Sequence, residues 1–220
     1  MTALVISEHN NEELKSVTLN TVTAAKELDE EIHILVAGKD CSGVAEASSK
    51  IEGVSKVLLV DSDEYEHCLA ENISTLVSKI SGEYNYILAP TTTSGKNFMP
   101  RVAALLDVSQ ISDICAIEGP DTFQRPIYAG NCIATVKTAD EKKVITVRTT
   151  AFDATPAESG SADIVSLEEV HDAGISEFIK EELAQSDRPE LTAADVIISG
   201  GRGMQNGENF SLLEGIADKL

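Results

Sequence analysis

Short, mostly apolar runs alternate with helical stretches through the first half of the chain. Such continuous runs are typical of strands in a parallel sheet that is covered on both faces. The predicted strand and helix pairs are 3–6 with 17–28, 32–37 with 44–51, 57–60 with 69–80, and 86–89 with a helix through 102–106. Four strand–helix units in succession predict an α/β fold, a mainly parallel sheet with helices on both faces.

The pattern changes after residue 110. Strand-like segments follow one another without helices between them, and residues typical of turns separate them. These segments are 111–118, 127–128, 132–137 and 144–148. The economical interpretation is an antiparallel extension of the parallel sheet. Further along, the composition predicts a loop over 155–163 and a short amphipathic helix over 175–183.

A polar stretch at 185–190, which contains Pro189, predicts a domain boundary. We therefore expect an N-terminal α/β domain over 1–188 and a second domain over 189–220. Residues 195–199 are predicted to form a strand, Gly200 to Gly203 a tight turn, and 207–220 a helix. One strand-loop-helix unit has no sheet of its own to join. We expect it to be the first unit of a second, truncated α/β domain.

Composition narrows the classes of partner. The formal net charge is −20, from 17 basic and 37 acidic residues, which argues against nucleic acid and anionic membrane surfaces as ligands. No apolar run approaches the length of a membrane span, so no membrane insertion is expected. The N-terminus lacks the pattern of a targeting segment, which favours a cytoplasmic protein.

The sequence contains no self-contained catalytic constellation. Cys41, Cys68, Cys115 and Cys132 are far apart and form no C-x-x-C pair, so we expect small buried thiols and no metal site. No G-x-S-x-G elbow marks a nucleophile. We therefore expect no catalytic residues and a protein that is not an enzyme by itself.

Residues 90–97 (PTTTSGKN) superficially resemble a nucleotide phosphate loop. Pro90 stands where that loop needs its first glycine, and Asn97 stands where it needs a magnesium-binding hydroxyl. In the first strand–helix loop, Glu8 would repel a phosphate. We expect no nucleotide in residues 1–188. A nucleotide-binding α/β domain remains one alternative function, and a cofactor-free subunit-docking module is another.

The glycine-rich turn at 199–203 (SGGRG) is the stronger candidate for a ligand site. It departs from G-x-G-x-x-G, because Asn206 follows Gly201 and Gly203 where a third glycine would stand. Arg202 favours a binding role, since a guanidinium on a glycine turn is suited to phosphate or to an electron-rich planar ring.

Several blocks of the chain resemble the alpha subunit of electron transfer flavoproteins. They are 4–9 (LVISEH), 95–104 (GKNFMPRVAA), 111–113 (ISD), 125–131 (RPIYAGN), 186–191 (SDRPEL) and 199–203 (SGGRG). Together they extend the resemblance over essentially the whole chain. The family's glycine-rich signature that contains Gln-His is absent, and family members continue well past residue 220, so we expect most of the FAD-binding domain to be missing here.

The resemblance implies an electron carrier rather than an enzyme. It implies an FAD-binding domain that begins near Pro189, and a heterodimer with a beta subunit that often holds AMP. FAD in the longer protein would accept electrons from flavin dehydrogenases of the acyl-CoA dehydrogenase type, the enzymes of fatty acid β-oxidation, and pass them to a quinone-reducing partner. Arg202, with Gly201 and Gly203, is carried over as a cofactor contact. A eukaryotic member would work in the mitochondrial matrix.

Overall fold

The computed structural model describes residues 2–29, 31–182, 191, 194 and 196–220. The chain divides into two compact units, residues 1–179 and residues 180–220, which are described here one at a time. The boundary expected between residues 188 and 189 lies outside the described residues and stays a prediction.

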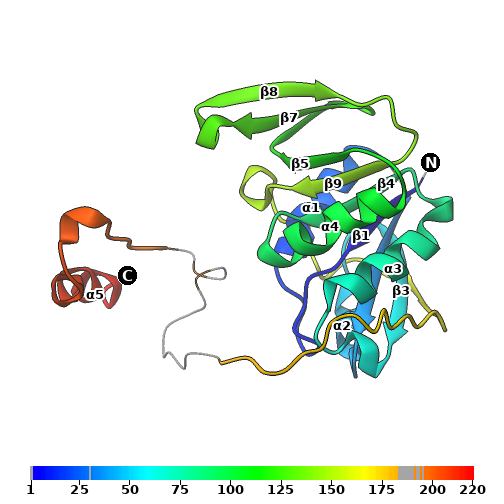
Figure 1. Ribbon diagram of the computed structural model, residues 1–220, viewed down its shortest axis with the longest axis horizontal. Coiled ribbons are helices and arrows are strands. Elements are labelled where there is room, and N and C mark those ends of the chain that lie inside the picture. The colour runs from blue at the N-terminus through cyan, green and yellow to red at the C-terminus, as the bar shows by residue number, and fades with distance from the viewer. Residues whose placement is uncertain (1, 30, 183–190, 192–193, 195) are drawn as a thin grey trace. The chain divides into compact units, whose positions relative to one another are not determined.

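A seven-stranded sheet forms the centre of the first unit (Figure 1). Its strands lie in the order β10-β3-β2-β1-β4-β9-β5, and every pairing is parallel. The predicted α/β fold is thereby confirmed. The bounds are β1 Ala3–Ile6, β2 Ile32–Gly38, β3 Val54–Asp61, β4 Tyr86–Pro90, β5 Gln110–Ile114, β9 Lys143–Val147 and β10 Asp163–Ser166.

Helices cover both faces of this sheet, as predicted. Helices α1 (Val17–Lys26) and α2 (Ser42–Ser49) share one buried apolar cluster with Ala3 and Val5 of β1. Helices α3 (Ala70–Ile80) and α4 (Thr93–Leu105) share the other with Leu4 and Ile6. Successive side chains of a strand point to opposite faces, so β1 contributes to both clusters and needs apolar residues throughout. Short 3-10 helices are η1 Asp63–Tyr65, η2 Ser81–Glu83, η3 Tyr128–Gly130 and η4 Thr149–Ala151.

The antiparallel strands form a sheet of their own rather than an extension of the main sheet. Strands β6 (Ala116–Gly119), β7 (Thr122–Ile127) and β8 (Cys132–Lys137) lie in the order β6-β7-β8. The strand predicted over 111–118 is divided: Ile114 still pairs with Val147 of β9, whereas Ala116 pairs with Gln124 of β7. Asp113 has a φ of 60° and lies in an irregularity of the β5–β9 pairing between Ile111 and Ile114, just before the chain leaves the main sheet.

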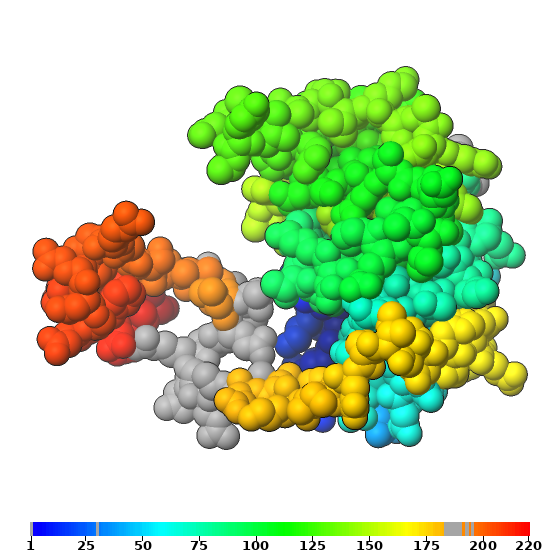
Figure 2. All heavy atoms as spheres, viewed as in Figure 1, coloured from blue at the N-terminus to red at the C-terminus, as the bar shows by residue number. Residues whose placement is uncertain are grey.

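Residues 175–182 are not helical, so the amphipathic helix predicted over 175–183 is wrong for its described part. The segment 167–179, here called the strap, instead lies extended on the surface of the first unit (Figure 2). The Tyr65 hydroxyl accepts a hydrogen bond from His171 N at 3.0 Å, and Asn72 Oδ1 accepts one from Ala173 N at 2.9 Å. The Phe178 ring stacks on His67 with 3.6 Å between ring centroids. The Phe178 side chain is thus packed against a ring although the strap is not helical.

The second unit contains two 3-10 helices, η5 Arg202–Met204 and η6 Gly207–Phe210, and helix α5 Ser211–Ala217. Residues 196–199 do not form the predicted strand, because an extended segment needs a neighbouring strand to satisfy its backbone. The helix predicted over 207–220 begins as a 3-10 turn and ends at Ala217. Across the described part of the chain, no helix has both the length and the apolar character needed to cross a bilayer.

Replacing Tyr65 with Phe should loosen the strap. The hydroxyl accepts from His171 N and donates to Glu169 O at 3.4 Å, and Phe can do neither. We expect a loss of about 1 kcal/mol in the free energy of unfolding and faster amide exchange at His171, measured by urea denaturation and by NMR. Tyr128→Phe, at an exposed hydroxyl, is the matched control. An unchanged exchange rate at His171 would show that the hydroxyl does not hold the strap.

Candidate functional site

The carboxyl ends of β1 and β4 are the place where an open parallel sheet usually binds a ligand. The chain proceeds from β1 through β2 to β3 on one side and then returns to β4 on the other side of β1. Such a change of direction leaves a crevice between the loops that follow the two neighbouring strands. The phosphate-loop-like segment 90–97 and the loop with Glu8 both lie at this point.

In this structure the two loops are bonded to each other across the crevice. The Thr92 hydroxyl donates to Glu8 Oε2 at 2.5 Å and accepts from Gly95 N at 3.1 Å, so it also caps helix α4. Burial raises the pKa of the Glu8 carboxyl, and the Thr92 hydrogen bond opposes that shift in part. The Glu8 carboxylate accepts a hydrogen bond from the Thr92 hydroxyl that caps α4, and its negative charge would repel a phosphate at this helix N-terminus. The expected absence of nucleotide from residues 1–188 thereby has a physical reason and stays a prediction.

Gly95 lies so close to the preceding strand that no larger residue fits. A Cβ at this position would lie 2.0 Å from the Pro90 carbonyl oxygen. The glycine that makes segment 90–97 look like a nucleotide loop therefore serves close packing between β4 and α4.

A second close contact lies at the end of β2. A Cβ on Gly38 would lie 2.3 Å from Asn11 Oδ1 and 2.8 Å from His9 Cε1. His9 Nδ1 accepts a hydrogen bond from Asn11 N at 3.1 Å, which requires a neutral ring nitrogen there. Burial lowers the pKa of His9 to about 4. The side chains of this loop are packed as structural elements.

The glycine turn of the second unit is, in contrast, exposed. Gly201, Arg202 and Gly203 are adjacent on it, and all three are exposed. The turn is closed by Met204 N donating to the Gly201 carbonyl at 2.9 Å, and Asn209 Nδ2 donates to the Met204 carbonyl at 2.8 Å. The structure therefore brings together the three residues expected from the sequence. Arg202 and Gly203 themselves belong to η5, and η6 lies between η5 and α5, so Arg202 does not lie directly at the N-terminus of an α-helix.

The glycines of this turn differ in whether neighbouring atoms leave room for a side chain. A Cβ on Gly200 would lie 2.6 Å from Leu213 Cδ1 and 2.7 Å from Met204 Cγ, so this glycine allows the turn to pack on its own helix. At Gly201 and Gly203 a Cβ would meet no described atom within 4 Å, and neither has a positive φ. Internal packing and backbone conformation thus do not require glycine at these two positions. Open backbone beside a guanidinium fits the close approach of a pyrophosphate or flavin.

Among the described residues, no group of three or more His, Cys, Asp or Glu side chains could hold a metal ion.

Comparison with known proteins shows which family the chain belongs to. Residues 3–172 match the family model described as "Electron transfer flavoprotein domain". The chain is 59% identical over 220 residues to the electron transfer flavoprotein subunit alpha of Pseudomonas aeruginosa, covering all of this chain and 71% of that protein. The chain belongs to this family.

Two other relatives support the same relationship. The mitochondrial electron transfer flavoprotein subunit alpha of Dictyostelium discoideum is 50% identical, with 66% of its length covered, and the Paracoccus denitrificans subunit alpha is 46% identical, with 71% covered. The resemblance stated from the sequence blocks is thus confirmed, and the electron transfer flavoprotein family supports a role in electron transfer. The family model ends at residue 172, before the glycine turn, whereas the three relatives are aligned over the whole chain.

Sequence reasoning missed two features of the first unit. It identified Glu8 as a charge hostile to phosphate but not as the partner of Thr92, since the two residues are 84 positions apart. The block 125–131 contains Arg125, but the sequence does not show that the buried Nε of this residue has no hydrogen-bond partner among the described residues. The sequence pattern predicted a strand only at 127–128, whereas β7 begins at Thr122 and places Arg125 on the same face as Phe123 and Ile127.

Replacing Gly95 with Ala should destabilise the first unit. The added methyl group would meet the Pro90 carbonyl oxygen, a backbone atom that cannot move aside without shifting β4 or α4. We expect a loss of about 1–3 kcal/mol in the free energy of unfolding, measured by urea denaturation. Gly82→Ala is the control, since a Cβ there meets nothing within 4 Å. Equal stability of the two variants would mean that the contact is relaxed at no cost.

His9 should make the first unit acid-sensitive. Its pKa is lowered from 6.5 to about 4 in the folded state, so the native state favours the neutral ring. This contribution is complete above pH 6.5 and is lost as the pH falls from about 6.5 to 4, by up to about 1.4 kcal/mol per pH unit. His9→Gln should flatten the acid dependence of unfolding in that window relative to wild type. The same slope in His9→Gln as in the wild type would contradict the assignment to His9.

Proposed function

We propose that the chain carries electrons as the alpha subunit of a heterodimer, together with FAD that is held in part by the glycine turn of the second unit. The observation that carries the proposal is the 59% identity with an alpha subunit over the entire chain, glycine turn included. The exposure of that turn and the open space at Gly201 and Gly203 are consistent with it.

The residues of the turn would divide the work of binding. Gly201 and Gly203 would let the cofactor approach the backbone, and the Arg202 guanidinium would supply a fixed positive charge in a planar fork. Bound FAD would supply the reversible acceptance of electrons. A positive charge beside the cofactor stabilises the electron-rich form more than the oxidised form and therefore raises the midpoint potential.

The proposed partners follow from the family resemblance. A beta subunit completes the heterodimer, flavin dehydrogenases of the acyl-CoA dehydrogenase type supply electrons, and a quinone-reducing protein accepts them. The location would be the cytoplasm, or the mitochondrial matrix in a eukaryote; the related proteins of Dictyostelium discoideum and Caenorhabditis elegans are named as mitochondrial. The chain itself would transfer electrons without transforming a substrate.

One alternative function has support of its own. The first unit contains most of the described apolar core, and segment 90–97 is packed as structure rather than left open for a nucleotide. A module that docks to another subunit without a cofactor would have these properties. The packing of segment 90–97 argues against the nucleotide-binding alternative, because the Thr92 hydroxyl is hydrogen-bonded to the Glu8 carboxylate and is not free for a phosphate.

An absorption spectrum separates the two functions. The chain would be co-expressed with a beta subunit in two forms, as 220 residues and as a fusion to the remaining C-terminal segment of the Pseudomonas aeruginosa relative. A flavin band that co-purifies with the heterodimer in either form supports the electron carrier. A heterodimer that is colourless in both forms, after incubation with FAD, would overturn it in favour of the docking module.

Replacing Arg202 with Ala in the flavin-loaded heterodimer should weaken FAD retention or lower the flavin midpoint potential, because the fixed positive charge is lost. Arg202→Lys should restore the property only in part, since a point charge replaces the planar fork. Flavin content per heterodimer and a redox titration are the measurements. Lys219→Gln removes one exposed positive charge from the same unit and is the control. Full flavin content with an unchanged potential in both Arg202 variants would remove Arg202 from the site.

A further inference from the structure

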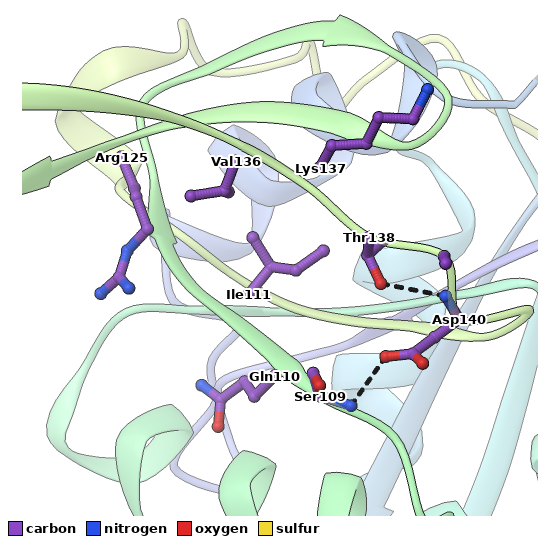
Figure 3. A pocket seen from close by; sticks show the side chains of 9 residues that line it. Ser109, Gln110, Ile111, Arg125, Val136, Lys137, Thr138 and Asp140 are labelled. Atoms are coloured by element: carbon purple, nitrogen blue, oxygen red, sulfur yellow. Dashed lines mark hydrogen bonds between the residues drawn. The ribbon is translucent and has the colours of Figure 1, made fainter.

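A cleft of about 280 Å³ lies between the two sheets of the first unit. One wall is the start of β5, with Ser109, Gln110 and Ile111 (Figure 3). The other is formed by Arg125 of β7 and by residues 136–140 at the end of β8. Since a water molecule takes up about 30 Å³ in the liquid, the cleft has room for a ligand of several non-hydrogen atoms. It lies in the first unit and plays no part in the function proposed for the glycine turn.

Arg125 faces the inside of the small sheet. Phe123 and Arg125 are two positions apart on β7, so their side chains lie on the same face. Phe123 is fully buried and belongs to the main apolar cluster. That face is therefore turned toward the core, and Arg125 places its guanidinium where an apolar side chain would be expected.

The guanidinium of Arg125 lacks a partner among the described residues. Its Nε is buried and forms no hydrogen bond, and no described carboxylate forms an ion pair with it. The two other arginines of the first unit are paired: Arg101 with Glu71 at 2.8 Å and Arg148 with Asp113 at 2.5 Å. A buried donor without an acceptor costs free energy, so it is usually satisfied by a water molecule, an ion or a ligand when the protein offers no acceptor.

The other charged side chains of the cleft, Lys137 and Asp140, have partners within the protein. Lys137 Nζ forms an ion pair with Asp121 at 3.0 Å. The Asp140 carboxylate accepts a hydrogen bond from Ser109 N at 2.9 Å, and Thr138 Oγ1 accepts one from Asp140 N at 3.1 Å. Figure 3 shows Asp140 and Arg125 at opposite ends of the cleft, with Ile111 and Val136 between them. The cleft therefore has a cationic end, an apolar middle and an anionic far end.

We propose that this cleft binds a short aliphatic monocarboxylate, with its carboxylate on Arg125 and its hydrocarbon stem on Ile111 and Val136. The fork of a guanidinium matches the two oxygens of a carboxylate. Asp140 excludes a second negative charge from the far end, which distinguishes a monocarboxylate from a dicarboxylate. A stem of a few carbons is suited to the two aliphatic side chains, whereas inorganic phosphate would leave them exposed to water.

The test is an NMR titration of the whole chain with butyrate at pH 7 and constant ionic strength, following the Arg125 Nε–H resonance and the Ile111 amide. A saturable shift is expected, with at least tenfold weaker binding of succinate, of phosphate and of the uncharged butyramide. Arg125→Gln should weaken butyrate binding at least tenfold, with the Ile111 amide as the reporter, and Arg125→Lys should weaken it less. Arg101→Gln, at a paired surface arginine, should bind butyrate as the wild type does.

Two further variants keep the test decisive if Arg125→Gln does not fold. Val136→Phe fills the middle of the cleft without changing charge and should abolish the shift. Asp140→Asn removes the anionic end and should tighten succinate binding relative to wild type. The absence of a saturable shift, or an equal shift in Arg125→Gln or Val136→Phe, would overturn the proposal. Loss of butyrate binding in the complex with a beta subunit would also overturn it and would assign the cleft to the subunit interface.

Discussion

Both faces of strand β1, the central strand of the seven-stranded sheet, are buried, because helices pack on each side of the sheet. Its side chains alternate between the cluster under α1 and α2 and the cluster under α3 and α4. A shift of one residue in its pairing would exchange these two sets of side chains. The burial of β1 therefore fixes the heights at which the loops after β1, β2 and β4 leave the sheet, and with them the contacts of Glu8, His9 and Thr92.

The two glycine-containing turns of the chain show how one local pattern serves two purposes. At Gly95 the missing side chain is required by a backbone oxygen of the same unit, and the neighbouring hydroxyl is satisfied by Glu8. At Gly201 and Gly203 no described atom lies close enough to exclude a side chain. A glycine turn is thus a candidate binding site when the space beside its Cα atoms stays empty after packing. It has a structural role when neighbouring atoms of the same unit fill that space.

The sequence predicted the features that depend on residues close together in the chain. The central strands and the helices between them follow from continuous apolar runs, and the Gly201 to Gly203 turn follows from its own residues. Strand β10 was not predicted because its side chains are exposed and its neighbour β3 precedes it by about a hundred residues. The division of 111–118 at Cys115, and the strap in place of a helix, depend on partners such as β7, Tyr65 and His67. For the same reason no local pattern could show that Arg125 lacks a partner.

Strand β10 has a consequence for how the chain folds during synthesis. It pairs Asp163 with Lys56, so the edge of the sheet at β3 is closed by residues made more than a hundred positions later. Contacts so distant in sequence form slowly, since a long loop must close first. Until residues 163–166 have left the ribosome, β3 presents unpaired backbone groups along an edge that can join a strand of another chain. Between the synthesis of β3 and that of β10, this edge of the nascent sheet is therefore open to pairing with another strand, even after α2 has covered its face.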